Sequence, residues 1–230
     1  MTGRAHGVDV APWVGEMRTA TVGASIYALP ASQRIRGAHA AHEAGCWIHA
    51  DVILRYRRDA GFVSVGVTLE QLEAVAAALP GAAIDVHLIL LGDAPEIRRD
   101  QVIDEVAEWL ERLSPTRVSA AAAVLDRIGR RLRAACPDVE LWGELWPAPE
   151  WAGATRLDGA LVMLIEPGTK QLADPGRLGV VSRVARTLPV GVDGGISKNT
   201  AMDAVRSGAS YLVLGRALFD PAPMAPEGAE

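Results

Sequence analysis

The feature that most constrains this chain is a series of short, strand-like apolar runs separated by segments of helical period. Eight such runs span 22–27, 47–52, 83–90, 117–121, 140–146, 161–165, 189–192 and 211–214. Segments with helical spacing of apolar residues lie between them, at 33–44, 69–79, 101–113, 124–135, 176–187 and 200–207. Strands that are apolar throughout are typical of a parallel sheet covered by helices. We therefore predict an α/β fold, a (β/α)8 TIM barrel, with a doubly wound open sheet as the alternative.

Length and composition favour one domain. The chain has 230 residues, of which 50% are hydrophobic, and this is enough apolar material for one complete core. A disordered chain or a disulfide-stapled miniprotein is excluded on the same grounds. We expect a single barrel domain over residues 21–220, an N-terminal extension over 1–20 and a Pro-rich tail over 221–230.

Charge and hydropathy exclude several partners. The formal net charge is −5 and the sequence pI is about 5.6, which gives no support for nucleic-acid binding. No apolar run approaches the roughly 18 residues of a membrane span, and the first residues lack the apolar stretch of a signal peptide. Cys46 and Cys136 have no metal-type spacing and suit a reducing compartment. We expect a cytoplasmic protein with no nucleic-acid or membrane partner.

Four side chains that bind metals fall near the predicted strand ends. His49 and Asp51 are two residues apart on one strand, so they face the same side, while His87 and Asp193 lie on two other strands. Two imidazoles and two carboxylates suit one divalent cation, namely zinc, iron or manganese. The alternative for each residue taken singly is structural: a hydrogen-bonded core histidine, or an aspartate that caps a helix.

Over residues 23–220 the chain resembles the ribulose-phosphate 3-epimerases. The matching segments, in chain order, are Ala24-Ser25-Ile26, His49-Ala50-Asp51-Val52, Asp85-Val86-His87-Leu88-Ile89, Met163 through Pro167-Gly168, Val192-Asp193-Gly194-Gly195-Ile196 and Leu214-Gly215-Arg216-Ala217-Leu218-Phe219. Their joint order and spacing carry the resemblance. It implies a barrel of the ribulose-phosphate-binding type and an isomerase that epimerises a carbohydrate phosphate at C3.

The resemblance also implies a mechanism. Asp51 and Asp193 would be the catalytic acid and base on opposite faces of the reacting carbon. His49 and His87, with the same two aspartates, would hold one divalent metal ion that stabilises the enediolate. The simplest reaction is D-ribulose 5-phosphate to D-xylulose 5-phosphate.

The same resemblance implies the remaining substrate contacts and the partners. The substrate is a small phosphorylated sugar, and the protein is expected to form a homo-oligomer. Glycine backbone near the last strands would approach the phosphate closely, because glycine has no side chain. The implied substrate-binding residues are Ser25, Met163, Gly168, Gly194, Gly195, Gly215 and Arg216.

The chain departs from the family's pattern around the far end of the substrate. Residues 52–63 predict a long loop with three arginines, Arg55, Arg57 and Arg58, and this loop is either a lid over an anion or a solvated charged loop. Residues 166–171 replace a glycine-rich segment, Arg216 replaces a small hydroxyl residue, and residues 142–146 are bulkier and more acidic than the family's.

These departures leave three alternatives open. Lys170 and Arg216 supply side-chain charge to a phosphate, or the pocket accepts a different sugar phosphate or another polar ligand. The third alternative is a barrel without catalysis that binds a ligand.

Overall fold

A computed structural model describes residues 8–17, 19–148 and 150–219. Its strands are β1 (Thr21–Ser25), β2 (Trp47–Arg57), β3 (Gly61–Ser64), β4 (Ile84–Leu91), β5 (Arg117–Ala120), β6 (Glu140–Leu145), β7 (Gly159–Met163), β8 (Val190–Asp193) and β9 (Tyr211–Leu214). Its α-helices are α1 (Arg34–Glu43), α2 (Leu69–Ala78), α3 (Glu96–Leu113), α4 (Ala122–Ala135), α5 (Leu178–Val184), α6 (Lys198–Arg206) and α7 (Arg216–Phe219).

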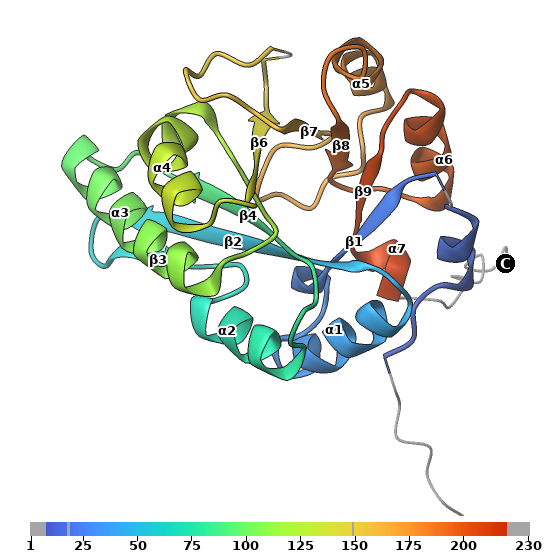
Figure 1. The fold of residues 1–230 in the computed structure, drawn as a ribbon, viewed down its shortest axis with the longest axis horizontal. Helices are drawn as coiled ribbons and strands as arrows, with labels where there is room; N and C mark the ends of the chain where they lie inside the picture. The colour runs from blue at the N-terminus through green and yellow to red at the C-terminus, as the bar shows by residue number, and fades with distance from the viewer. Residues whose placement is uncertain (1–7, 18, 149, 220–230) are drawn as a thin grey trace, which may run out of the picture.

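Eight of the described strands form a closed parallel barrel. The parallel pairings follow the order β2, β4, β5, β6, β7, β8, β9. Strand β1 pairs in parallel with both ends of this series, β2 and β9. The second pairing of β1 closes the ring and excludes the open doubly wound sheet. The helices surround the strands (Figure 1). The predicted TIM barrel is confirmed.

The helices cover the barrel with the apolar faces that their sequences predict. In α3 the side chains of Ile103, Val106 and Leu110 are buried against the strands. The helix begins at Glu96, five residues before the predicted start at residue 101, directly after Pro95. Proline suits the residue before a helix because it needs no backbone donor there.

The prediction of a long, arginine-containing loop after Asp51 is wrong. Strand β2 continues to Arg57, turns at 58–60 and returns antiparallel as β3, so that Tyr56 lies opposite Phe62. The Tyr56 and Phe62 rings pack with centroids 5.4 Å apart, a cross-strand pair that stabilises a hairpin. Together with the long β4, this hairpin extends one wall of the barrel beyond the other strands (Figure 1).

Two further segments fill out the barrel's surface. No helix lies between β6 and β7 among residues 146–148 and 150–158; the Trp151 ring lies instead against β6 at Gly143. The described part of the expected extension includes a short 3-10 helix, η1 (Pro12–Glu16), and the Ala11 N–H donates to the carbonyl of Leu218. Residues 1–7 and the expected tail at 221–230 lie outside the described residues. None of the described helices is both long and apolar enough to cross a membrane.

Candidate active site at the carboxyl ends of the barrel strands

The four predicted metal ligands meet in one buried cluster. His49 and Asp51 lie on β2, His87 lies opposite Asp51 on the neighbouring β4, and Asp193 ends β8 across the barrel. One nitrogen or oxygen from each residue lies within 4.8 Å of the others. The cluster is at the carboxyl ends of the strands, where TIM barrels place their active sites.

The cluster's geometry fits a divalent cation. Asp51 Oδ1 lies 3.4 Å from His49 Nε2 and 3.5 Å from His87 Nδ1, and Asp193 Oδ2 lies 3.4 Å from His87 Nδ1. A tetrahedron of ligands about 2.0–2.1 Å from a zinc ion has edges of roughly 3.3 Å. Among the described residues, His87 Nδ1 is also a buried polar atom without a hydrogen-bond partner. These four residues are therefore suited to hold a metal ion.

Each histidine is held from behind by a second carboxylate. Asp85 Oδ2 lies 2.7 Å from His49 Nδ1, and Glu144 Oε2 lies 2.8 Å from His87 Nε2. Because a carboxylate accepts the proton of the nitrogen it contacts, these bonds direct His49 Nε2 and His87 Nδ1 toward the cluster, where each would bind a metal ion in exchange for a proton. Sequence reasoning gave Asp85 and Glu144 no role. The sequence predicts that both residues lie on strands, but it does not predict which side chains of other strands they contact.

Asp85 is anchored in turn by the layer of side chains below it. The Tyr211 hydroxyl donates a 2.7 Å hydrogen bond to Asp85 Oδ2. The Arg117 guanidinium stacks 3.7 Å from the Trp142 ring centroid and 4.3 Å from that of Tyr211, and it donates to Glu140. This packing fixes the Tyr211 ring, so the position of His49 is determined by layers that reach deep into the barrel.

The electrostatics of the cluster separate its two cavity-facing aspartates. Burial and the negative charge of Asp51 raise the pKa of Asp193, although His87 opposes this shift. For Asp51, burial is outweighed by His49 and His87, which lower its pKa well below the usual range. Burial of His49 is likewise outweighed by Asp51 and Asp85, which raise its pKa to about 10. The cluster thus favours positive charge, and its surroundings shift the pKa values of the two aspartates in opposite directions.

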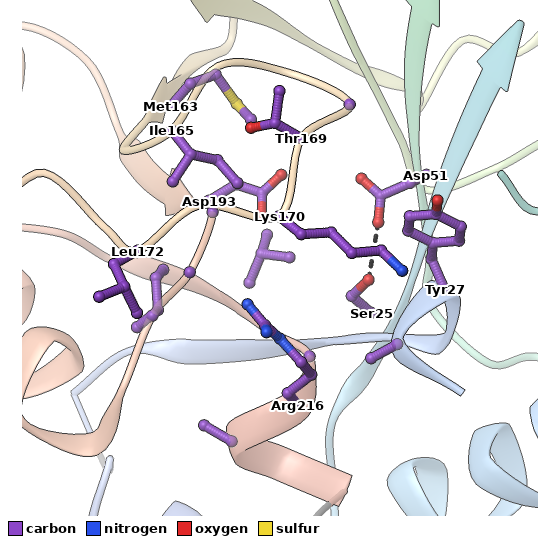
Figure 2. A pocket seen from close by; sticks show the side chains of 18 of the residues that line it. Ser25, Tyr27, Asp51, Met163, Ile165, Thr169, Lys170, Leu172, Asp193 and Arg216 are labelled. Atoms are coloured by element: carbon purple, nitrogen blue, oxygen red, sulfur yellow. Dashed lines mark hydrogen bonds between the residues drawn. The ribbon is translucent and has the colours of Figure 1, made fainter. Parts of the chain in front are cut away.

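A cavity of about 500 Å³ opens directly above the cluster (Figure 2). Asp51 and Asp193 face into it, whereas His49 and His87 lie fully buried behind them. Apolar side chains such as Met163, Ile165 and Leu172 form one part of its wall. All of the predicted substrate-binding residues line it, namely Ser25, Met163, Gly168, Gly194, Gly195, Gly215 and Arg216.

A smaller cavity of about 340 Å³ adjoins the first. It lies between the β2–β3 hairpin and the segment after β7, with Arg55 and Tyr56 on one side and Glu166 on the other. Gly168 and Thr169 line both cavities, so the two cavities meet at this segment. Of the three predicted loop arginines only Arg55 reaches this cavity, and Arg57 pairs with Asp59 in the exposed turn.

Fold and site together define a TIM-barrel protein with a cavity at the carboxyl ends of its strands. Phosphoribosyl anthranilate isomerase from Thermus thermophilus is similar, with a TM-score of 0.57, 15% identity, and coverage of 86% of this chain and 88% of that chain. KGPDC from Streptococcus mutans has a TM-score of 0.57 and 14% identity, with coverage of 86% of this chain and 89% of that chain.

A glycerophosphodiester phosphodiesterase from Parabacteroides distasonis has a TM-score of 0.59 and 11% identity, covering 85% of this chain and 92% of that chain. No protein-family model matches this chain, and no curated protein matches it in sequence. At these identities the likeness shows the fold alone.

Proposed function

We propose that this protein is a metal-dependent epimerase of a ketose phosphate, acting most simply on D-ribulose 5-phosphate to give D-xylulose 5-phosphate. The observation that carries the proposal is the pair Asp51 and Asp193, which face one cavity from β2 and β8 with opposite pKa shifts. Epimerisation beside a carbonyl needs a base on one face of the carbon and an acid on the other. A pair of carboxylates that differ in proton affinity suits this reaction.

In the proposed mechanism one of the two aspartates removes the proton from C3, and the other, acting as the acid, returns a proton to the opposite face. The two residues exchange roles in the reverse reaction. A divalent ion held by His49, His87, Asp51 and Asp193 would stabilise the negative charge that develops on the substrate oxygens.

The other cavity residues position the substrate and the base. The Ser25 hydroxyl donates a 2.7 Å hydrogen bond to Asp51 Oδ2, which aims that carboxylate into the cavity. Met163 is an apolar neighbour that excludes water from the reacting carbon. The backbone N–H groups of Gly194, Gly195 and Gly215 would face the phosphate, which glycine permits because it allows close approach.

Proton exchange at C3 tests the proposal directly. The zinc-, iron- or manganese-loaded protein is mixed with D-ribulose 5-phosphate in D₂O, and C3 is followed by NMR. We expect deuterium at C3 together with xylulose 5-phosphate, and loss of turnover by about 10³-fold or more in Asp51→Asn and Asp193→Asn. Asp203→Asn, an exposed change of the same kind on α6, is the control.

Each other outcome has a definite meaning. Turnover near the normal rate in either cavity variant would overturn the acid–base assignment. Exchange without the epimer would mean that only one carboxylate transfers protons. A protein that binds no stoichiometric metal and catalyses no exchange would be a ligand-binding barrel instead.

The second candidate is an epimerase or isomerase of a different sugar phosphate. The second cavity favours it, because the hairpin residues Arg55 and Tyr56 provide room and contacts beyond the first cavity. A panel of pentulose and hexulose phosphates in the same exchange assay separates the two. Faster exchange of a six-carbon ketose phosphate would establish this candidate.

A further inference from the structure

Two cationic side chains enter the large cavity from different elements. Lys170 belongs to the segment after β7, and Arg216 begins α7 (Figure 2). Neither forms an ion pair or a side-chain hydrogen bond within the described residues. The Lys170 ammonium lies 5.9 Å from the centroid of the Tyr27 ring. Two positive side chains that line one cavity and form no ion pair there favour an anionic ligand.

The charges that line the cavity divide into two groups. The charged lining residues are Asp51, Asp193, Lys170 and Arg216. Both aspartates contact the buried histidines, and among the described residues neither forms an ion pair with Lys170 or Arg216. The two cations are left with a charge of about +2 together, which matches a phosphate monoester of about −1.5 to −2 better than a carboxylate or a neutral sugar.

The backbone beside the two cations is also free to bind an anion. Gly194 and Gly195 line the same cavity, and their N–H groups form no backbone hydrogen bond among the described residues. Their positive φ angles of 106° and 63° are conformations that favour glycine. Segment 171–173 packs closely on Gly195, so that a Cβ there would lie 2.7 Å from Ala173 N, and this position requires glycine.

We propose that Lys170 and Arg216 form a cation pair that binds the phosphate monoester of the substrate and makes the protein selective for phosphorylated over unphosphorylated sugars. This inference rests on the proposed function and extends it. It assigns Lys170 a role in binding and places the phosphate between a side chain of the β7–α5 loop and a side chain of α7. Arg216 provides a planar fork suited to two phosphate oxygens, and Lys170 provides a point charge.

Phosphate binding without turnover is the first test. Inorganic phosphate is titrated into the metal-loaded protein by calorimetry, with acetate as a monoanionic comparison. We expect Lys170→Ala and Arg216→Ala each to weaken phosphate binding about 10- to 100-fold, since each removes one or more charge-assisted hydrogen bonds. Arg186→Ala is the control: it removes one positive charge from an exposed residue that does not line the cavity.

Kinetics with paired substrates is the second test. In both variants we expect KM for the ketose phosphate to rise about 10- to 100-fold, with kcat changed much less, because the phosphate is bound but takes no part in the proton transfers at C3. The rate ratio between D-ribulose 5-phosphate and D-ribulose should fall by a similar factor. Lys170→Arg should restore most of the wild-type KM.

The two tests separate this inference from the proposed function. If the variants lose phosphate binding while the wild-type protein shows no C3 exchange, the cation pair stands and the epimerase proposal fails. If the wild-type protein is an epimerase but both variants keep its KM and its preference for the phosphorylated sugar, the cation pair is overturned. Equal weakening in Arg186→Ala would also overturn it, because net charge alone would then explain the effect.

Discussion

At the scale of single residues, the candidate site depends on which nitrogen of each histidine faces the cluster. His49 presents Nε2 and His87 presents Nδ1, and in both the other nitrogen contacts a carboxylate from a different strand. Such contacts fix the tautomer and the ring orientation of a metal-binding histidine and increase its basicity. Asp85 and Glu144 do not line the large cavity, so in the proposed site they would affect metal affinity rather than contact a substrate.

Removing the charge behind His49 should weaken metal binding. We expect Asp85→Asn to lower zinc affinity by about 10- to 100-fold, and Tyr211→Phe, which removes only a hydroxyl, to have a smaller effect in the same direction. Competition with a chromophoric chelator measures this without any assay of activity. Ser119→Ala is the matched control, since its 3.5 Å contact with Asp85 is the weakest of the three. An unchanged affinity in Asp85→Asn would contradict the positioning role.

Glu144 should have a parallel effect through His87. Glu144→Gln keeps the size of the side chain but loses its charge, so it allows His87 the wrong tautomer and should also weaken metal binding by about 10-fold or more. Glu105→Gln on the exposed face of α3 is the control. The cobalt-loaded protein adds a second measurement, because a changed ligand orientation alters its visible absorption spectrum. Identical spectra and affinities in both variants would show that Glu144 is merely structural.

At the scale of elements, the sequence predicts the strands of the barrel but not the β2–β3 hairpin that extends one of its walls. Apolar strands with helical segments between them identify the parallel sheet, and residues two apart on a strand predict that His49 and Asp51 share a face. The β2–β3 hairpin was not predicted because its arginines suggested a solvated loop, while its stability depends on Tyr56 packing against Phe62. Contacts between distant strands, such as His87 with Glu144, leave no periodic signal at all.

The segment that follows the hairpin packs against β2, the strand that carries Asp51. Gly66 packs so closely on β2 that a Cβ there would overlap the Asp51 carbonyl and lie 2.8 Å from Ile53 N. Gly66→Ala should therefore destabilise the protein by about 2 kcal/mol and slow turnover by displacing Asp51. Urea unfolding measures the first effect and the C3 exchange assay the second.

A glycine in open space provides the comparison for Gly66. Gly179 lies exposed in α5 with nothing within 4 Å of its built Cβ, so Gly179→Ala should leave turnover unchanged and stabilise the protein by about 0.5 kcal/mol. If Gly66→Ala were as mild as Gly179→Ala, the close packing of this segment on β2 would not be important for the site.

At the scale of the whole molecule, the closed sheet links the site to the stability of the barrel. Buried side chains continue from the Arg117 stack through Asp85 and His49 to the cavity, so the cluster is built on the core. The expected homo-oligomer stays a prediction, and light scattering coupled to size-exclusion chromatography measures it. Apart from β3, which pairs only with β2, every described strand has a neighbour on both sides, and this closed ring favours unfolding as one cooperative unit.

The reactivity of the two cysteine thiols measures whether the barrel unfolds as one cooperative unit. Cys46 precedes β2 and Cys136 follows α4, and each is only 5% exposed. Burial raises the pKa of the Cys46 thiol to about 11, so at pH 8 about one molecule in a thousand carries the reactive thiolate. We expect neither thiol to react quickly with a disulfide reagent, and both to react at one common rate set by unfolding in moderate urea. A single thiol that reacts within seconds in buffer would show that its part of the barrel opens locally, against the cooperative unfolding that the closed sheet implies.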